Sequence, residues 1–128
     1  MAQVSRGAAG ESLAARYLRQ KGYELLDVNY HSRFGEIDII AEKNDFLVFV
    51  EVKTRGEQAL YEPREAVSAE KQRKILQTAL LYLAQNPTEK QPRFDVIEVF
   101  MLKNAAMKAK KIEHIENAFE ANGIQSAF

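Results

Sequence analysis

Two stretches of the chain carry apolar residues at helical spacing, and each stretch ends at residues that stop helices. The first runs from Ser5 to Lys21 and is followed by Gly22, and the second runs from about Ser68 to Gln85 and is followed by Asn86-Pro87. The apolar positions that share a face are Leu13, Ala14, Tyr17 and Leu18 in the first stretch and Leu76, Ala79, Leu80 and Leu83 in the second. The spacing predicts two amphipathic helices, each with one face packed on a core.

Four further stretches are rich in β-branched and aromatic residues, a composition that is typical of strands. They span residues 23–30, 36–40, 46–53 and 94–100. Residues 42–45 separate the second from the third and have turn chemistry, so these two strands are expected to form a hairpin. Residues 54–63 are predicted to be a loop, and residues 112–119 form a last element whose type the pattern leaves open.

The predicted elements follow one another as α-β-β-β-α-β, and the pattern does not define the structure after about residue 103. Neither an internal repeat nor a flexible linker divides the chain, and 128 residues fit one domain of ordinary size. Helices at either end of an antiparallel hairpin favour an α/β sandwich over a barrel. We therefore expect a single α/β domain over residues 1–128.

Composition narrows the class of protein. Hydrophobic residues make up 46% of the chain and charged residues 28%, which is typical of a soluble globular protein. The chain has no cysteine, which excludes a disulfide framework and a thiolate-rich zinc site. No apolar run approaches the roughly 20 residues of a membrane span, so we expect a cytoplasmic protein with no membrane partner. With 18 basic and 18 acidic residues, any site for a polyanion must be local.

The hairpin gives four charged residues defined positions. A symmetric turn centred on residues 44–45 places Asp38 directly opposite Glu51, and it places Glu36 opposite Lys53. The apolar residues alternate, with Ile37, Ile39, Val48, Val50 and Val52 expected on one face and Ile40, Leu47 and Phe49 expected on the face of the charges. Two carboxylates therefore meet on a face that is partly apolar.

Like charges directly opposed in a sheet, with Cβ atoms about 4.5–5.5 Å apart, are destabilising. A divalent cation such as Mg²⁺ removes this repulsion, because it prefers carboxylate oxygens and leaves coordination positions for phosphate oxygens. Lys53 lies one pleat along from Glu51, where its amine could stabilise charge that develops on a phosphate or orient an attacking water.

Simpler interpretations of these residues remain open. The charges can lie on an exposed face, where Glu36 and Lys53 would form an ion pair worth about 0–1 kcal/mol. A register slip by one residue would send Asp38 and Glu51 to opposite faces. Glu11, at the margin of the inward stripe of the first helix, can either extend the acidic cluster or complement the dipole of the helix.

Several short motifs together resemble a known family. They are Gly10-Glu11, Gly35-Glu36-Ile37-Asp38, Phe49-Val50-Glu51-Val52-Lys53, and Glu65-Ala66-Val67 followed by Lys71. The second and third are similar to the PD-(D/E)XK nuclease signature, with Ile37 where the proline of that signature would stand. The whole set, from about Gly10 to Leu83, resembles the YraN-like family, an uncharacterised group similar to archaeal Holliday junction resolvases.

The resemblance implies a restriction-endonuclease-like fold with a central mixed sheet flanked by helices. By that analogy Asp38 and Glu51 bind Mg²⁺ or Mn²⁺, and Lys53 is the catalytic lysine. Glu11 would supply a further acidic group from the first helix. Arg55, Lys71 and Gln72 are the candidates for contact with nucleic acid: the two cations could hold phosphates, and Gln72 places a polar group on an apolar helix face.

The leading hypothesis is a Mg²⁺-dependent endonuclease that acts on DNA, including branched or structured DNA, with a homodimer as a further expectation. The competing hypothesis is a non-catalytic module that binds nucleic acid or protein and retains the nuclease fold. RNA also stays open as a target, because phosphodiester chemistry does not by itself distinguish the two sugars.

Overall fold

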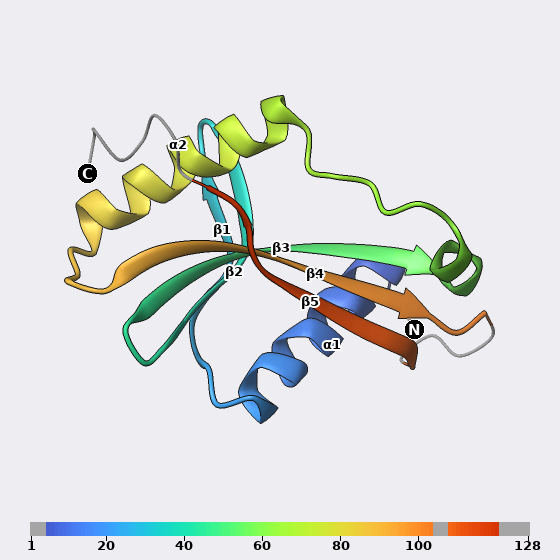
Figure 1. The fold of residues 1–128 in the computed structure, drawn as a ribbon. Coiled ribbons are helices and arrows are strands. Elements are labelled where there is room, and N and C mark those ends of the chain that lie inside the picture. Colours follow the sequence, from blue (N-terminus) through green and yellow to red (C-terminus); the bar gives the residue numbers. More distant parts are fainter. Residues whose placement is uncertain (1–4, 104–107, 121–128) are drawn as a thin grey trace.

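The computed structural model describes residues 5–103 and 108–120, and within them one mixed sheet carries a helix on each face (Figure 1). The elements in chain order are α1 (Arg6–Gln20), β1 (Glu24–Ser32), β2 (Gly35–Lys43), β3 (Phe46–Gly56), the 3-10 helix η1 (Glu57–Tyr61), α2 (Ala69–Gln85), β4 (Gln91–Met101) and β5 (Ala109–Phe119). The strands lie side by side in the order of the sequence, and all neighbours are antiparallel except β3 and β4. The predicted α/β class and the mixed sheet between helices are confirmed.

Side-chain caps fix where the two helices begin. The Ser5 hydroxyl accepts a hydrogen bond from the Ala8 backbone N–H at 3.1 Å, and the Ser68 hydroxyl accepts one from the Lys71 N–H at 3.2 Å. The inward face of α1 consists mainly of small apolar residues, and Leu18 in its last turn is fully buried. No helix in the described part of the chain combines the length and hydropathy that crossing a bilayer requires.

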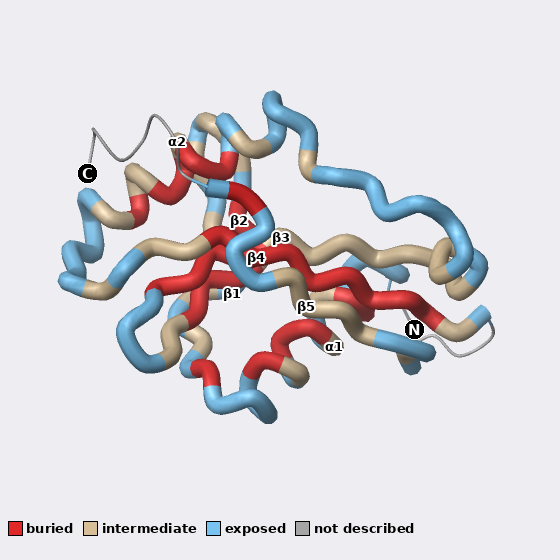
Figure 2. Tube along the Cα trace, viewed as in Figure 1, coloured by how far each residue is buried: buried red, intermediate tan, exposed pale blue. Residues whose placement is uncertain are grey.

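Two apolar layers form the core, one on each face of the sheet. The layer under α1 contains Ile39, Val48 and Val50, and the layer under α2 contains Ile40 and Phe49. Figure 2 shows that the buried part of the molecule follows the central strands and the inner sides of both helices. The alternation along the hairpin therefore places its apolar residues on the two faces as expected between positions 39 and 50.

One apolar residue departs from that alternation. Ile37 was expected on the face of Ile39, but it packs in the α2 layer with Ile40. The paired part of β2 and β3 ends at Ile39 and Val50. Because β3 no longer holds the start of β2, this segment follows its own twist and turns Ile37 towards α2.

The chain is more regular after the hairpin than its composition indicates. The predicted loop over residues 54–63 is wrong at its start, because β3 continues to Gly56 along β4 and η1 follows directly. The undefined last element is the edge strand β5, which pairs with β4. Side chains of mixed polarity hide both segments from a pattern analysis, since only one face of each is covered.

Candidate metal centre

The hairpin forks where the acidic residues begin. The two-residue turn at Asn44 and Asp45 sets the register that the sequence predicts, and its last pair is Ile39 opposite Val50. One residue further on, the Asp38 carboxylate accepts a hydrogen bond from the Val52 backbone N–H at 2.8 Å. A side chain thus takes the place of the next ladder bond, and the two strands separate at this point.

Four elements deliver charged side chains to this fork. Glu11 comes from α1, Asp38 from β2, Glu51 from β3 and Lys71 from α2, and all four line one open cleft with a volume of about 410 Å³. The Lys71 Nζ lies 3.3 Å from Glu51 Oε1. The structure therefore brings together three of the four residues expected to be catalytic, with a lysine from the second helix.

Close contact between α1 and β3 carries Glu11 into the cleft. Gly10 faces Thr54, and a Cβ atom at position 10 would lie 1.9 Å from the Thr54 Oγ1. Only glycine lets the helix approach this near, because any side chain would strike the strand. The glycine that precedes Glu11 thus has a packing role in the geometry of the site.

Three carboxyl groups of the cleft have a raised pKa, those of Glu11, Asp38 and Glu51. Burial, followed by the charge of Asp38, raises the pKa of Glu51 from 4.5 to about 7, although Lys71 and Lys53 oppose the shift. Burial also raises the pKa of Asp38, against the hydrogen bond from Val52. The pKa of Glu11 is raised by burial first, and then by the charge of Asp38 and a hydrogen bond shared with it. The positive charge around these three acids is too small to keep their pKa values at the ordinary level.

Lys53 contacts the protein away from the fork. Its Nζ donates a hydrogen bond to the Glu65 backbone carbonyl at 3.0 Å, and the side chain borders a neighbouring cavity of about 250 Å³. The alternative ion pair between Glu36 and Lys53 is not formed, since Glu36 lies 3.3 Å from His31 Nδ1 instead. Lys53 is close enough to lower the pKa of Glu51, so its charge still acts on the cluster.

Of the three residues expected to contact nucleic acid, Arg55 and Gln72 contact protein groups in this structure. Arg55 Nε lies 3.0 Å from Glu98 Oε2, and the Gln72 side-chain amide donates to the Val67 carbonyl at 2.9 Å. In this arrangement Arg55 neutralises a carboxylate and Gln72 ties the start of α2 to the segment before it. Lys71 is the one of the three candidates that lies among the acids of the cleft.

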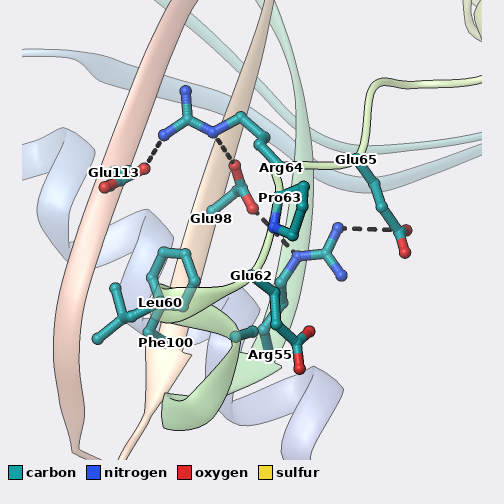
Figure 3. Close-up of a pocket in the computed structure, with 10 residues that line it drawn as sticks. Arg55, Leu60, Glu62, Pro63, Arg64, Glu65, Glu98, Phe100 and Glu113 are labelled. Atoms are coloured by element: carbon teal, nitrogen blue, oxygen red, sulfur yellow. Dashed lines mark hydrogen bonds and ion pairs between the residues drawn. The ribbon is translucent and has the colours of Figure 1, made fainter.

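Glu98 is a buried carboxylate that sequence reasoning did not single out. It is 2% exposed, and Arg64 Nε lies 2.9 Å from its Oε1 while Arg55 holds the other oxygen. Figure 3 shows this pair of guanidinium groups around Glu98, in a cavity of about 160 Å³ where Arg64 also reaches Glu113. An acidic residue between Ile97 and Val99 in an apolar strand is the signal that could have found it.

A second buried acid, Asp95, is hydrogen-bonded through both of its carboxylate oxygens. Asp95 accepts hydrogen bonds from Arg93 at 2.9 Å, from the Asn117 backbone N–H at 3.0 Å, and lies 2.7 Å from His114 Nε2. Burial alone would raise the pKa of Asp95, but these partners hold it below its usual range. Buried acids elsewhere in the described chain are thus compensated, while those of the cleft are not.

This donor set suits a hard divalent cation better than a softer one. In the described residues, no three His, Cys, Asp or Glu side chains converge closely enough to form a protein cage for a metal ion. Mg²⁺ does not need a cage, because it binds through one or two carboxylates and keeps water or phosphate oxygens as its other ligands. Asp38 and Glu51 meet that requirement. A cation there would stabilise their ionised forms, which the cleft otherwise disfavours.

Comparisons with known proteins agree on one group. The sequence model of the uncharacterised protein family UPF0102 matches residues 10–99. A UPF0102 protein of Alkaliphilus oremlandii is 51% identical over 116 residues, which cover 88% of this chain and 96% of that relative. A UPF0102 protein of Thermodesulfovibrio yellowstonii is 44% identical over 119 residues, which cover 93% of this chain and 99% of that relative. The matched residues include all four that line the fork.

Proposed function

The chain belongs to the uncharacterised protein family UPF0102, and we propose that it is a divalent-metal-dependent nuclease that cuts phosphodiester bonds in DNA. The observation that carries the proposal is the fork of β2 and β3, where Asp38 and Glu51 are held side by side with raised pKa values. Strongly perturbed carboxyl groups in an open cleft are typical of sites that bind metal or do chemistry.

Each charged residue at or near the fork has its own role in the proposed reaction. Asp38 and Glu51 would hold Mg²⁺ or Mn²⁺, and the bound cation would supply positive charge to a phosphate oxygen. Asp38 is fixed for this by the Val52 N–H, which donates a hydrogen bond to one of its oxygens. Glu11, which shares a hydrogen bond with Asp38, can accept a proton from an attacking water. Lys53 adds charge near the leaving group once it turns from the Glu65 carbonyl.

The fold supports the same class of enzyme. The mixed sheet with one helix on each face agrees with the restriction-endonuclease-like fold that the sequence motifs imply, and the acids stand where β2 leaves β3. The net charge of zero means that attraction to DNA comes from the cleft rather than from the whole surface. We therefore propose a substrate whose own geometry presents phosphates to a recess, such as branched or otherwise structured DNA.

A competing function follows from the place of Lys53. Its amine is bound to the Glu65 carbonyl and not to the acids, as in a module that keeps the fold and has lost the reaction. Such a module would bind nucleic acid or protein without cutting it. The two functions differ in one measurable respect, which is turnover in the presence of a cation.

The test is a cleavage assay with branched, single-stranded and duplex DNA, with and without Mg²⁺ or Mn²⁺. We expect cation-dependent cutting that falls at least about 100-fold in Asp38→Asn, because the site then loses a charged ligand. Asp45→Asn, an exposed position in the turn of the same hairpin, is the matched control and should cut like the wild type. Binding of DNA without cleavage by the wild type, under all these conditions, would favour the non-catalytic module.

A further inference from the structure

Lys71 contacts Glu51 in the cleft, and no other described lysine pairs with an acid of the cleft. Its backbone N–H is fixed by the Ser68 cap in the first turn of α2, and its Nζ lies 3.3 Å from Glu51 Oε1. The Glu51 side chain is 13% exposed and that of Lys71 is 47% exposed. The ammonium therefore joins a buried carboxylate to the solvent-filled cleft.

Neighbouring lysines show that this contact is specific. Lys53 is on the next residue but one from Glu51 and yet donates to the Glu65 carbonyl. Lys74, one helical turn beyond Lys71, pairs with Glu70 along the surface of α2 at 3.5 Å. Of these three amines, only that of Lys71 touches an oxygen that the proposed cation would use.

An ammonium and a divalent cation cannot both occupy Glu51 at low cost. The two would compete for the same oxygen, and at such a short distance two positive charges repel each other, more strongly when one of them is divalent. The Lys71 side chain is flexible and half exposed, and the cleft of about 410 Å³ gives it room to turn. Arrival of the cation thus releases an ammonium into the place where a substrate must lie.

We propose that Lys71 is a substrate-binding residue that the cation sets free: its ammonium rests on Glu51 until a divalent ion displaces it, and then contacts a phosphate of the nucleic acid. The inference rests on the proposed function, and it adds a regulation of the same site. It makes the cation and the nucleic acid cooperative ligands, because each favours the state in which Lys71 has left Glu51.

The experiment measures binding and not turnover. Ca²⁺ serves as the probe cation because it takes oxygen ligands, and a short DNA duplex serves as the probe nucleic acid. Titrations at pH 8.5 keep protons from competing for Glu51, whose pKa is about 7. Calorimetry then gives the Ca²⁺ affinity of the wild type, Lys71→Ala and Lys74→Ala, and fluorescence anisotropy gives the DNA affinity of each at several salt concentrations.

We expect Lys71→Ala to bind Ca²⁺ about 3- to 10-fold more tightly than the wild type, since a competing charge is removed. With Ca²⁺ present, the salt dependence of its DNA affinity should be shallower by about 0.9, the value for one lost phosphate contact. Without Ca²⁺ the two proteins should show the same salt dependence. Lys74→Ala should behave like the wild type throughout.

The outcomes separate this inference from the proposed function. If Lys71→Ala binds Ca²⁺ no more tightly than the wild type, or if its salt dependence differs equally with and without Ca²⁺, the role of Lys71 is refuted and the nuclease proposal stands. If the wild type binds neither Ca²⁺ nor Mg²⁺, both fall. If the expected affinities are found but no DNA is cut, Lys71 has the proposed role in a protein that is not a nuclease.

Discussion

At the scale of single residues, the described chain treats its buried acids in two ways. Asp95 and Glu98 each meet guanidinium groups that satisfy their charge. Asp38 shares a hydrogen bond with Glu11 and repels the charge of Glu51, and the groups that directly contact the pair are one backbone N–H and one partly exposed ammonium. A buried charge without full compensation is costly, so retention of both acids in the cleft points to a ligand rather than to stability.

The first prediction concerns Glu51 and pH. Its pKa rises from 4.5 in the unfolded chain to about 7 in the fold, so the fold loses stability as pH rises through this interval and the full loss remains above pH 7. At 1.36 kcal/mol per pKa unit, Glu51→Gln should raise the free energy of unfolding at pH 8 by up to about 3 kcal/mol, with little gain at pH 4. Urea unfolding at both pH values measures the difference.

Addition of Mg²⁺ provides the control for this prediction. A cation at the fork should stabilise the wild type at pH 8 by mass action and should stabilise Glu51→Gln less. An equal gain from Glu51→Gln at pH 4 and at pH 8 would show that packing, and not charge, causes it.

The sequence predicts the positions of the acids better than the positions of the lysine side chains that act on them. The spacing of Asp38 and Glu51 around a two-residue turn fixes their approach, because strand geometry leaves few alternatives once the turn is known. The position of the Lys53 amine depends on rotamers and on a carbonyl twelve residues later, at Glu65. Long side chains choose partners from the tertiary structure, so spacing along the strand could not show that Lys71 would contact Glu51.

At the scale of elements, the register of the hairpin is confirmed up to the pair Ile39–Val50, and the predicted opposition of Asp38 and Glu51 lies beyond the paired residues. The elements after the hairpin show what local patterns miss. β3 continues past the fork because β4 pairs with it along all eleven of its residues, and that pairing is not local. The same holds for β5, which pairs in the described part of the chain with β4, a strand that lies before it in the sequence. Periodicity detects a face buried by neighbouring residues, but it does not detect an edge completed by distant ones.

The second prediction concerns the segment between η1 and α2. Arg64 from this segment and Arg55 from β3 share the buried Glu98, so Glu98→Ala would remove the only buried carboxylate that either guanidinium group contacts among the described residues. Breaking a buried pair in this way costs about 3–5 kcal/mol, which chemical unfolding will measure. Limited proteolysis at Arg64 should also become faster.

Glu65→Ala is the matched control. Its side chain is 77% exposed and lies 3.5 Å from Arg55, a surface ion pair that contributes about 0–1 kcal/mol. If the two variants lose the same free energy of unfolding, burial of Glu98 does not set its importance.

At the scale of the whole molecule, the acidic cleft takes its residues from both helices and from the two strands between them. α1 and α2 cover opposite faces of the sheet (Figure 1), and each contributes a charged residue to the cleft, Glu11 and Lys71. The balance of 18 basic and 18 acidic residues leaves no general attraction to a polyanion. Recognition at this scale would therefore depend on the shape of the cleft and on the charge that a cation brings to it.

The number of residues between paired strands also affects the order in which the chain folds. β2 and β3 join through a short turn, whereas β3 and β4 can pair only after residues 57–90 have folded back between them. Asp38 and Glu51 thus come together in a local hairpin before α2 delivers the Lys71 ammonium. The repulsion between the two acids should already be felt at the barrier to folding.

Above pH 7, Glu51→Gln should accordingly refold faster than the wild type and unfold at nearly the same rate, which stopped-flow fluorescence can follow through the tyrosines. Slower unfolding with unchanged refolding would place the meeting of the acids after the barrier. In the expected case, repulsion between the two carboxylates proposed to bind the cation also slows the folding of the chain.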